Sequence, residues 1–152
     1  IYPESFAARV SQMVSDTEIS IEIWDEPKLR AEGCRAMLAV GGGSSKPPRL
    51  VIMRYGGGGT EQPIAIVGKG VTFDSGGLSL KPSESMADMK CDMAGAATVA
   101  GGMHAVARLG LRQNVSGRGG LAEIMVSGKY AKVNGVIAFL AETWRTLCLQ
   151  RP

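Results

Sequence analysis

Residues 64–81 read IAIVGKGVTFDSGGLSLK, a short apolar run followed by a segment rich in glycine and serine. The run Ile64–Val67 lies between Pro63 and Gly68, which is typical of an interior strand. We expect a loop from Gly68 to about Ser85. Lys69 would then lie near the end of the strand, where α/β folds place their ligands.

Helix and strand patterns alternate on both sides of this stretch. Working outward, the sequence predicts a helix beginning at Tyr2–Ser5, a half-buried strand at 19–24, a helix from Pro27 to the glycines at 41–43, an interior strand at 50–53, and a long helix at 86–111. Strands that alternate with helices indicate an α/β class. We expect an α/β/α layered domain with a mixed, mostly parallel sheet.

The pattern weakens after Leu111. A strand should begin at Asn114, but Arg118-Gly119-Gly120 interrupts it. The segment from Arg112 onward is therefore expected to be the least well packed part of the chain.

The composition is that of an ordinary soluble protein, with 45% hydrophobic and 20% charged residues. No apolar run is long enough for a membrane span, and the first residues do not resemble a secretory signal. Cys34, Cys91 and Cys148 form neither a CxxC pattern nor a disulfide framework, so we expect a reducing, cytoplasmic setting. The start at Ile1 suggests a chain cut from something longer.

Positive charge is concentrated at the C-terminal end. The net charge of the chain is +3. The Lys and Arg residues after position 111 are Arg112, Arg118, Lys129, Lys132, Arg145 and Arg151, and the only acids there are Glu123 and Glu142. A nucleic-acid surface in this basic tail is an open alternative, although few aromatic residues accompany it.

Four charged residues surround the glycine-rich segment. Asp74 precedes the turn Ser75-Gly76-Gly77, Lys69 and Lys81 flank it, and Asp92 lies near the start of the long helix. Two carboxylates and two lysines could bind a divalent metal and stabilise an oxyanion.

Ordinary structural roles remain open on the residues alone. Asp74 could cap a turn, Asp92 could be a solvated helix residue, and both lysines could be surface charges. A phosphate-binding loop is a rival for Gly68-Lys69, but its pattern fails because Pro63 stands at the first glycine and Gly70 at the Ser or Thr.

The motifs VGKGVTFDSGGLSLKP at 67–82 and MADMKCDMAGAATV at 86–99 resemble the leucine aminopeptidase family of cytosolic, dinuclear metallo-exopeptidases. The likeness extends upstream through WDEPKLRAEGCRAMLAVGGGSSKPPRLVIMRY at 24–55. It covers roughly residues 1–115 and corresponds to the first half of the family's catalytic domain, a zinc-exopeptidase-like fold. The family's smaller N-terminal domain has no counterpart in this sequence.

The resemblance implies a role for each of five residues. Asp74 would bridge two metal ions, while Lys69, as a neutral amine, and Asp92 would bind one of them. Lys81 would be the catalytic residue that steadies the negative oxygen of the tetrahedral intermediate. Met89 would line the substrate pocket. A complete site of the family holds two divalent ions, manganese or zinc, which activate water to attack the first peptide bond of a peptide with a free N-terminus.

The likeness changes character after about residue 115. The family continues into ENMPSG and then NTDAEGRL, which supplies an Asp, a Glu and an Arg. This chain has LAEIMVSG at 121–128, and the second motif does not follow. We interpret the chain as a truncated or disturbed copy, and we expect at most one metal ion in it.

These observations lead to one interpretation of the whole chain. Residues 1–16 would be a linker helix into the catalytic domain, 17–115 the first part of that domain, and 116–152 a degraded or atypical tail. The expected function is a cytoplasmic leucyl-aminopeptidase-type metalloexopeptidase, an incomplete copy with impaired activity. The family forms homo-hexamers; a membrane or nucleic-acid partner is not expected. The alternative is a non-catalytic remnant that binds a partner protein or nucleic acid through the basic tail.

Overall fold

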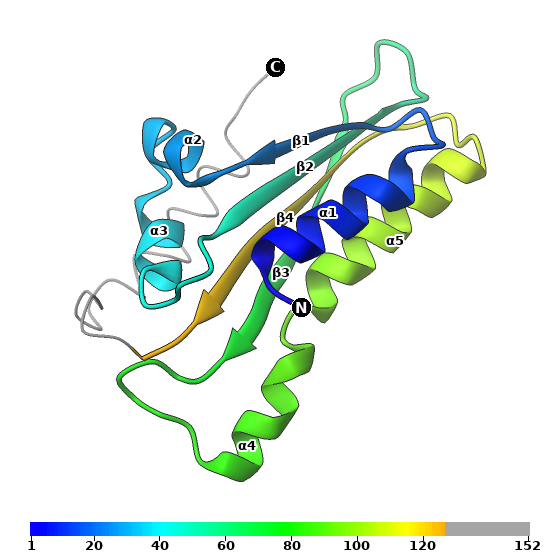
Figure 1. Ribbon diagram of the computed structural model, residues 1–152. Helices are drawn as coiled ribbons and strands as arrows, with labels where there is room; N and C mark the ends of the chain where they lie inside the picture. The colour runs from blue at the N-terminus through cyan, green and yellow to red at the C-terminus, as the bar shows by residue number, and fades with distance from the viewer. Residues whose placement is uncertain (127–152) are drawn as a thin grey trace.

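The computed structural model describes residues 1–126, in which five α-helices and a short 3-10 helix surround one sheet (Figure 1). The elements in chain order are α1 Pro3–Val14, β1 Ser20–Trp24, α2 Glu26–Ala31, α3 Arg35–Gly41, β2 Arg49–Gly56, β3 Ile64–Asp74, α4 Ser83–Asp88, the 3-10 helix η1 Met89–Cys91, α5 Ala94–Arg108 and β4 Asn114–Ile124.

The four strands lie in the order β1-β2-β4-β3. β2 is antiparallel to both of its neighbours, and β3 is parallel to β4. The connection between the parallel strands β3 and β4 contains the longest helix, α5. Such a crossover returns the chain to the end of the sheet where β3 began, so that β4 can run in the same direction. The expected mixed sheet is confirmed, but the expected excess of parallel pairs is wrong for the described strands.

Helices cover both faces of the sheet, which confirms the layered α/β/α arrangement. β2 shows this most clearly, because its consecutive residues Leu50, Val51, Ile52 and Met53 are all buried. Val51 and Met53 belong to the core under α1 and α5, whereas Leu50 and Ile52 belong to a second core under α2 and α3. A strand buried on both faces carries a continuous apolar run, as this one does.

The N-terminal half follows the sequence patterns closely. The predicted helix at the start is α1, which buries Phe6, Val10 and Val14 on one face. The predicted strands at 19–24 and 50–53 are β1 and β2. The predicted helix beginning at Pro27 is instead two short helices, because Gly33 adopts a φ of +72° between α2 and α3. A left-handed residue ends a helix, and glycine adopts that conformation without strain.

The interruption expected at residues 118–120 is not present. β4 runs unbroken through Arg118, Gly119 and Gly120 and lies between β2 and β3 in the sheet. One of its glycines is a site of close packing: a Cβ added at Gly117 would lie 2.5 Å from Cγ of Met103 in α5. The expectation of a poorly packed segment from Arg112 is therefore wrong for residues 114–124. The boundary expected between 115 and 116 falls inside this strand. The rest of the expected tail, 127–152, lies outside the described residues.

Two further expectations need correction. Residues 86–111 do not form one helix, since α4 ends at Asp88 and α5 begins at Ala94, with η1 between them. β3 is an outer strand among those described, and Ile64 is 53% exposed and Val67 38% exposed. Within residues 1–126, no helix has both the length and the apolar character needed to cross a membrane.

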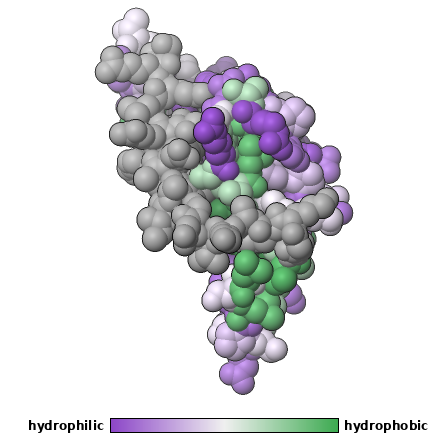
Figure 2. All heavy atoms as spheres, turned by 90° about the vertical axis from the view of Figure 1, so that its left-hand side faces the viewer, coloured by the Kyte–Doolittle hydropathy of each residue, from purple (hydrophilic) through white to green (hydrophobic). Residues whose placement is uncertain are grey.

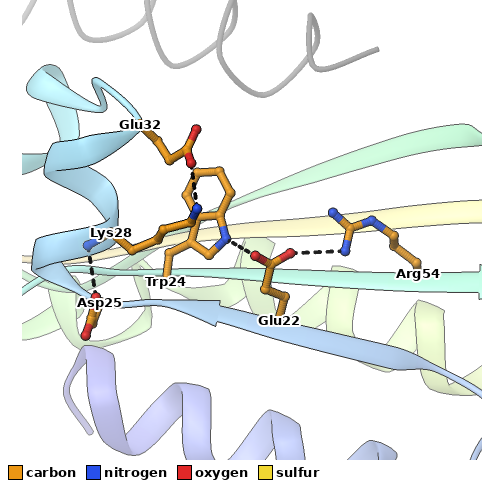
Figure 3. Close-up of polar contacts among 6 residues, drawn as sticks. All are labelled: Glu22, Trp24, Asp25, Lys28, Glu32 and Arg54. Carbon is orange, nitrogen blue, oxygen red and sulfur yellow. Dashed lines mark hydrogen bonds and ion pairs between the residues drawn. The ribbon is translucent and has the colours of Figure 1, made fainter. Parts of the chain in front are cut away.

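A polar network joins β1, β2 and α2 on the surface (Figure 3). Glu22 accepts a hydrogen bond from Nε1 of Trp24 at 2.5 Å and one from Arg54 at 3.2 Å. Lys28 lies over the Trp24 ring, 5.3 Å from its centroid. The hydrogen bond from Trp24, together with that from Arg54 and its positive charge, holds the pKa of Glu22 below its usual range.

We predict that Glu22→Gln lowers the free energy of unfolding by about 0.5 kcal/mol at neutral pH, as expected for a partly exposed charged pair. A carboxyl whose folded pKa is lowered stabilises the fold above its unfolded pKa of about 4.3. That stabilisation is lost as the pH falls through the lower, folded pKa. Urea unfolding of both proteins at several pH values tests this, with the exposed Glu18→Gln as control. A difference that stays constant down to the lowest pH would contradict it.

Candidate metal centre

Lys69 lies in the middle of β3, not near the end of the strand as expected. The strand continues to Asp74 because its ladder with β4 continues, pairing Lys69 with Gly120 and Asp74 with Ile124. Both residues therefore belong to the sheet, and the loop begins only after Asp74. The ladder with β4 therefore fixes the backbone at both residues.

The start of α5 lies directly against β3 next to Lys69. A Cβ added at Gly68 would lie 2.7 Å from Cα of Ala96 and closer still to Gly95. A Cβ added at Gly95 would lie 3.0 Å from the backbone nitrogen of Lys69. The helix can approach this closely only because neither position has a side chain. The charged residues alone do not point to these two glycines; the usable signal in the sequence is that Gly68 directly precedes Lys69 and that Gly95 lies among small residues soon after Asp92.

This close approach brings Asp92 to Lys69. Asp92 follows η1, which packs against β3, and its carboxylate forms an ion pair with the ammonium of Lys69. Oδ2 of Asp92 is buried, and within the described residues it accepts no hydrogen bond of ordinary geometry. The Lys69 side chain is 59% exposed, so this amine remains accessible from solvent.

Asp74 is held by the loop that follows it. Its Oδ2 accepts a hydrogen bond from Nζ of Lys81 at 2.7 Å, and its Oδ1 accepts one from the backbone nitrogen of Gly76 at 2.8 Å. The carbonyl of Ser75 accepts a hydrogen bond from the backbone nitrogen of Lys81 at 2.9 Å, which closes the loop. Gly76 has a φ of +86°, a conformation that a residue with a side chain rarely adopts.

The four charged residues singled out from the sequence thus form two ion pairs, Lys69 with Asp92 and Lys81 with Asp74. Each pair cancels its own charge, so neither carboxylate is left uncompensated in a partly buried position. Met89, expected to line a substrate pocket, lies in η1 and is half-buried. The sequence also predicts that Lys69, Asp74 and Asp92 converge on one small cleft with Lys81 at its rim, and this stays a prediction.

The donor set fits part of a metal site. Lys69 and Asp92 place an amine and a carboxylate oxygen in contact, and that oxygen is buried with unused acceptor capacity. Asp74, which ends β3 where the loop begins, adds a second carboxylate. Within residues 1–126, however, no group of three or more His, Cys, Asp or Glu residues is arranged to hold an ion. A divalent ion takes several oxygen ligands, so the described residues supply an incomplete shell.

The loop after β3 also presents apolar surface. Leu78 and Leu80 are 55% and 61% exposed and lie between the turn at Gly76 and Lys81. Figure 2 views the molecule from the left-hand side of Figure 1 and shows apolar residues gathered on the lower part of that side. The loop therefore combines a fixed charged pair with exposed leucines.

The model of the cytosol aminopeptidase catalytic domain matches residues 1–144 of this chain. The chain belongs to the cytosol aminopeptidase family. A probable cytosol aminopeptidase of Rhodopirellula baltica is 60% identical over 135 residues, which cover 89% of this chain and 27% of that protein. One from Micrococcus luteus is 48% identical over 90% of this chain and 27% of its own length. The chain thus spans little more than a quarter of these family members.

Solved structures of other proteins share the fold. The bottromycin maturation enzyme BotP, in a complex with Mn, superposes with a TM-score of 0.81 at 41% identity over 87% of this chain and 29% of that one. The cytosol aminopeptidase from Coxiella burnetii gives a TM-score of 0.81 at 30% identity over 86% and 28% of the two chains. The family expected from the motifs at 67–82 and 86–99 is confirmed.

We predict that Gly68→Ala lowers the free energy of unfolding by about 3 kcal/mol, because the added methyl group meets the backbone of α5 and cannot be accommodated by a side-chain movement. The control is Gly101→Ala in α5, where an added Cβ meets nothing within 4 Å among the described residues. That change should stabilise the protein by up to about 1 kcal/mol through helix propensity. Chemical denaturation of the two variants measures both effects; equal stabilities would show that the packing of α5 on β3 is loose.

Proposed function

We propose that residues 1–126 form part of the metal site of a cytoplasmic aminopeptidase that removes N-terminal residues from peptides. The observation that supports this most directly is the pairing of Lys69 with Asp92 and of Lys81 with Asp74 in a chain of the cytosol aminopeptidase family. By the resemblance of the motifs at 67–82 and 86–99, these four positions would be those of the metal and oxyanion sites.

Each residue has a task that its surroundings favour. Lys69 and Asp92 would hold one divalent ion, manganese or zinc, with Asp74 as a second carboxylate ligand. The bound ion would supply Lewis acidity for the activation of water. Lys69 must give up its proton to act as an amine ligand, and its largely exposed side chain allows that proton to leave to solvent.

Lys81 would serve as the cation beside the metal site. Its ammonium is held beside the site by the ion pair with Asp74 at 2.7 Å, and a cation there could stabilise the negative charge that develops on the substrate oxygen. Met89 in η1 would contact the first side chain of the peptide. As the family implies, the substrate would be a peptide with a free N-terminus.

We predict that the 152-residue chain alone is at most a weak peptidase, even when saturated with manganese or zinc. Two divalent ions bring four positive charges, and the described residues place only Asp74 and Asp92 at the proposed site to balance them. Loss of a metal ligand or of its supporting partner costs orders of magnitude in affinity or rate. Hydrolysis of leucine p-nitroanilide across a metal titration measures the activity.

The control for this assay is Asp74→Ala, with Asp16→Ala as a surface carboxylate remote from the site in sequence. Any residual activity should fall at least tenfold in Asp74→Ala and stay unchanged in Asp16→Ala. Turnover of roughly 1–10³ per second, which is usual for enzymes, would contradict the prediction if Asp74→Ala abolished it. It would mean that residues beyond 126 or a second copy complete the ligand set.

A further inference from the structure

Lys69 and Asp74 are five residues apart on the same strand. Successive side chains of a regular strand point to opposite faces, so an odd separation would place these two on opposite sides of the sheet. Gly68 and Gly70 show which face is which, because a Cβ added at either would meet α5 at Ala96. Lys69, between them, points away from the face that α5 covers, and in a regular strand Asp74 would point toward it.

The register of β3 changes before Asp74 is reached. Val71 is paired with Ala122 and Phe73 with Glu123, so two steps along β3 match one step along β4. One extra residue of this kind is a β-bulge, and it reverses the side-chain alternation beyond it. Lys69 is paired with Gly120 and Asp74 with Ile124, four residues apart on β4. An even separation places both on the same face.

Thr72 is the extra residue, and its side chain is bonded across the bulge. It is 2% exposed, and its hydroxyl donates a hydrogen bond to the carbonyl of Ala122 at 3.3 Å. A buried hydroxyl without a partner is costly, so this bond favours the bulged register over a regular one. After the bulge, the backbone nitrogen of Ser75 donates a hydrogen bond to the carbonyl of Ile124 at 3.1 Å, and this bond fixes the start of the loop.

We propose that Thr72 is a positioning residue for the metal centre: its hydroxyl holds the bulge that turns Asp74 to the same face of the sheet as Lys69. This inference rests on the proposed function, because the bulge matters for metal binding only if Lys69 and Asp74 belong to one site. Thr72 itself touches neither residue's charged group. It acts through the backbone of β3, where bulges beside active sites commonly redirect a side chain.

Three variants test the proposal. Thr72→Val keeps the branched shape and removes the hydroxyl, whereas Thr72→Ser keeps the hydroxyl. Ser116→Ala is the matched control, since it removes another buried strand hydroxyl, one that has no hydrogen-bond partner within the described residues. Two readouts are taken on the 152-residue chain: Mn²⁺ affinity from the electron paramagnetic resonance signal of the free ion, and the NMR resonance of the Gly76 amide, which donates to Asp74 Oδ1 and needs no metal.

We expect Thr72→Val to shift the Gly76 resonance and to weaken Mn²⁺ binding about tenfold, the usual effect of losing a supporting partner. Thr72→Ser should restore both, and Ser116→Ala should change neither. The proposal would be overturned if Thr72→Val left the Gly76 resonance unchanged. It would also be overturned if the resonance shifted but the Mn²⁺ affinity stayed the same. If Thr72→Val does not fold, Thr72→Ser decides: a native Gly76 resonance supports the role of the hydroxyl and a displaced one refutes it.

A parent chain that binds no Mn²⁺ would refute the proposed function instead. The Gly76 amide then decides the positioning role alone. A shift in Thr72→Val that Thr72→Ser reverses supports it, and the absence of any shift overturns it.

Discussion

The close packing of α5 on β3 at Gly68 and Gly95 is the constraint on which the candidate metal centre depends. With no side chain at either position, the first turn of the helix reaches the backbone of the strand at Lys69. Because η1 and Asp92 come immediately before that turn, the same contact delivers the Asp92 carboxylate to the Lys69 amine. A bulkier residue at Gly68 would move the helix and its carboxylate away together.

The second pair depends on the loop rather than on the helix. Asp74 ends β3, and the turn at Gly76 folds the chain back so that Lys81 meets the same carboxylate. The two pairs come from consecutive parts of the chain, β3, its loop and η1, and each is neutral by itself. The chain can therefore hold all four charged groups in place with no ion bound, at little electrostatic cost.

Sequence patterns predicted the elements whose packing is simple. The one-sided helix α1 and the doubly buried strand β2 follow directly from the spacing of their apolar residues. β4 was not predictable in this way, because Arg118-Gly119-Gly120 was interpreted as a break, whereas α5 packs over the strand at Gly117 and Gly119. The motifs singled out the four charged residues that form the two ion pairs, but the placement of these residues in the fold was not predictable. Neither the position of Lys69 in the middle of β3 nor the bulge at Thr72 leaves a periodic pattern in the sequence.

If Lys69 and Asp92 hold a divalent ion between them, anomalous diffraction at the manganese absorption edge will locate it. Crystals of the 152-residue chain equilibrated with Mn²⁺ should show an anomalous peak within bonding distance of Nζ of Lys69 and Oδ2 of Asp92, with their ion pair replaced by two bonds to the ion. The peak should disappear in Asp92→Asn crystals. An intact Lys69–Asp92 ion pair with no peak beside it, at saturating Mn²⁺, would contradict the account.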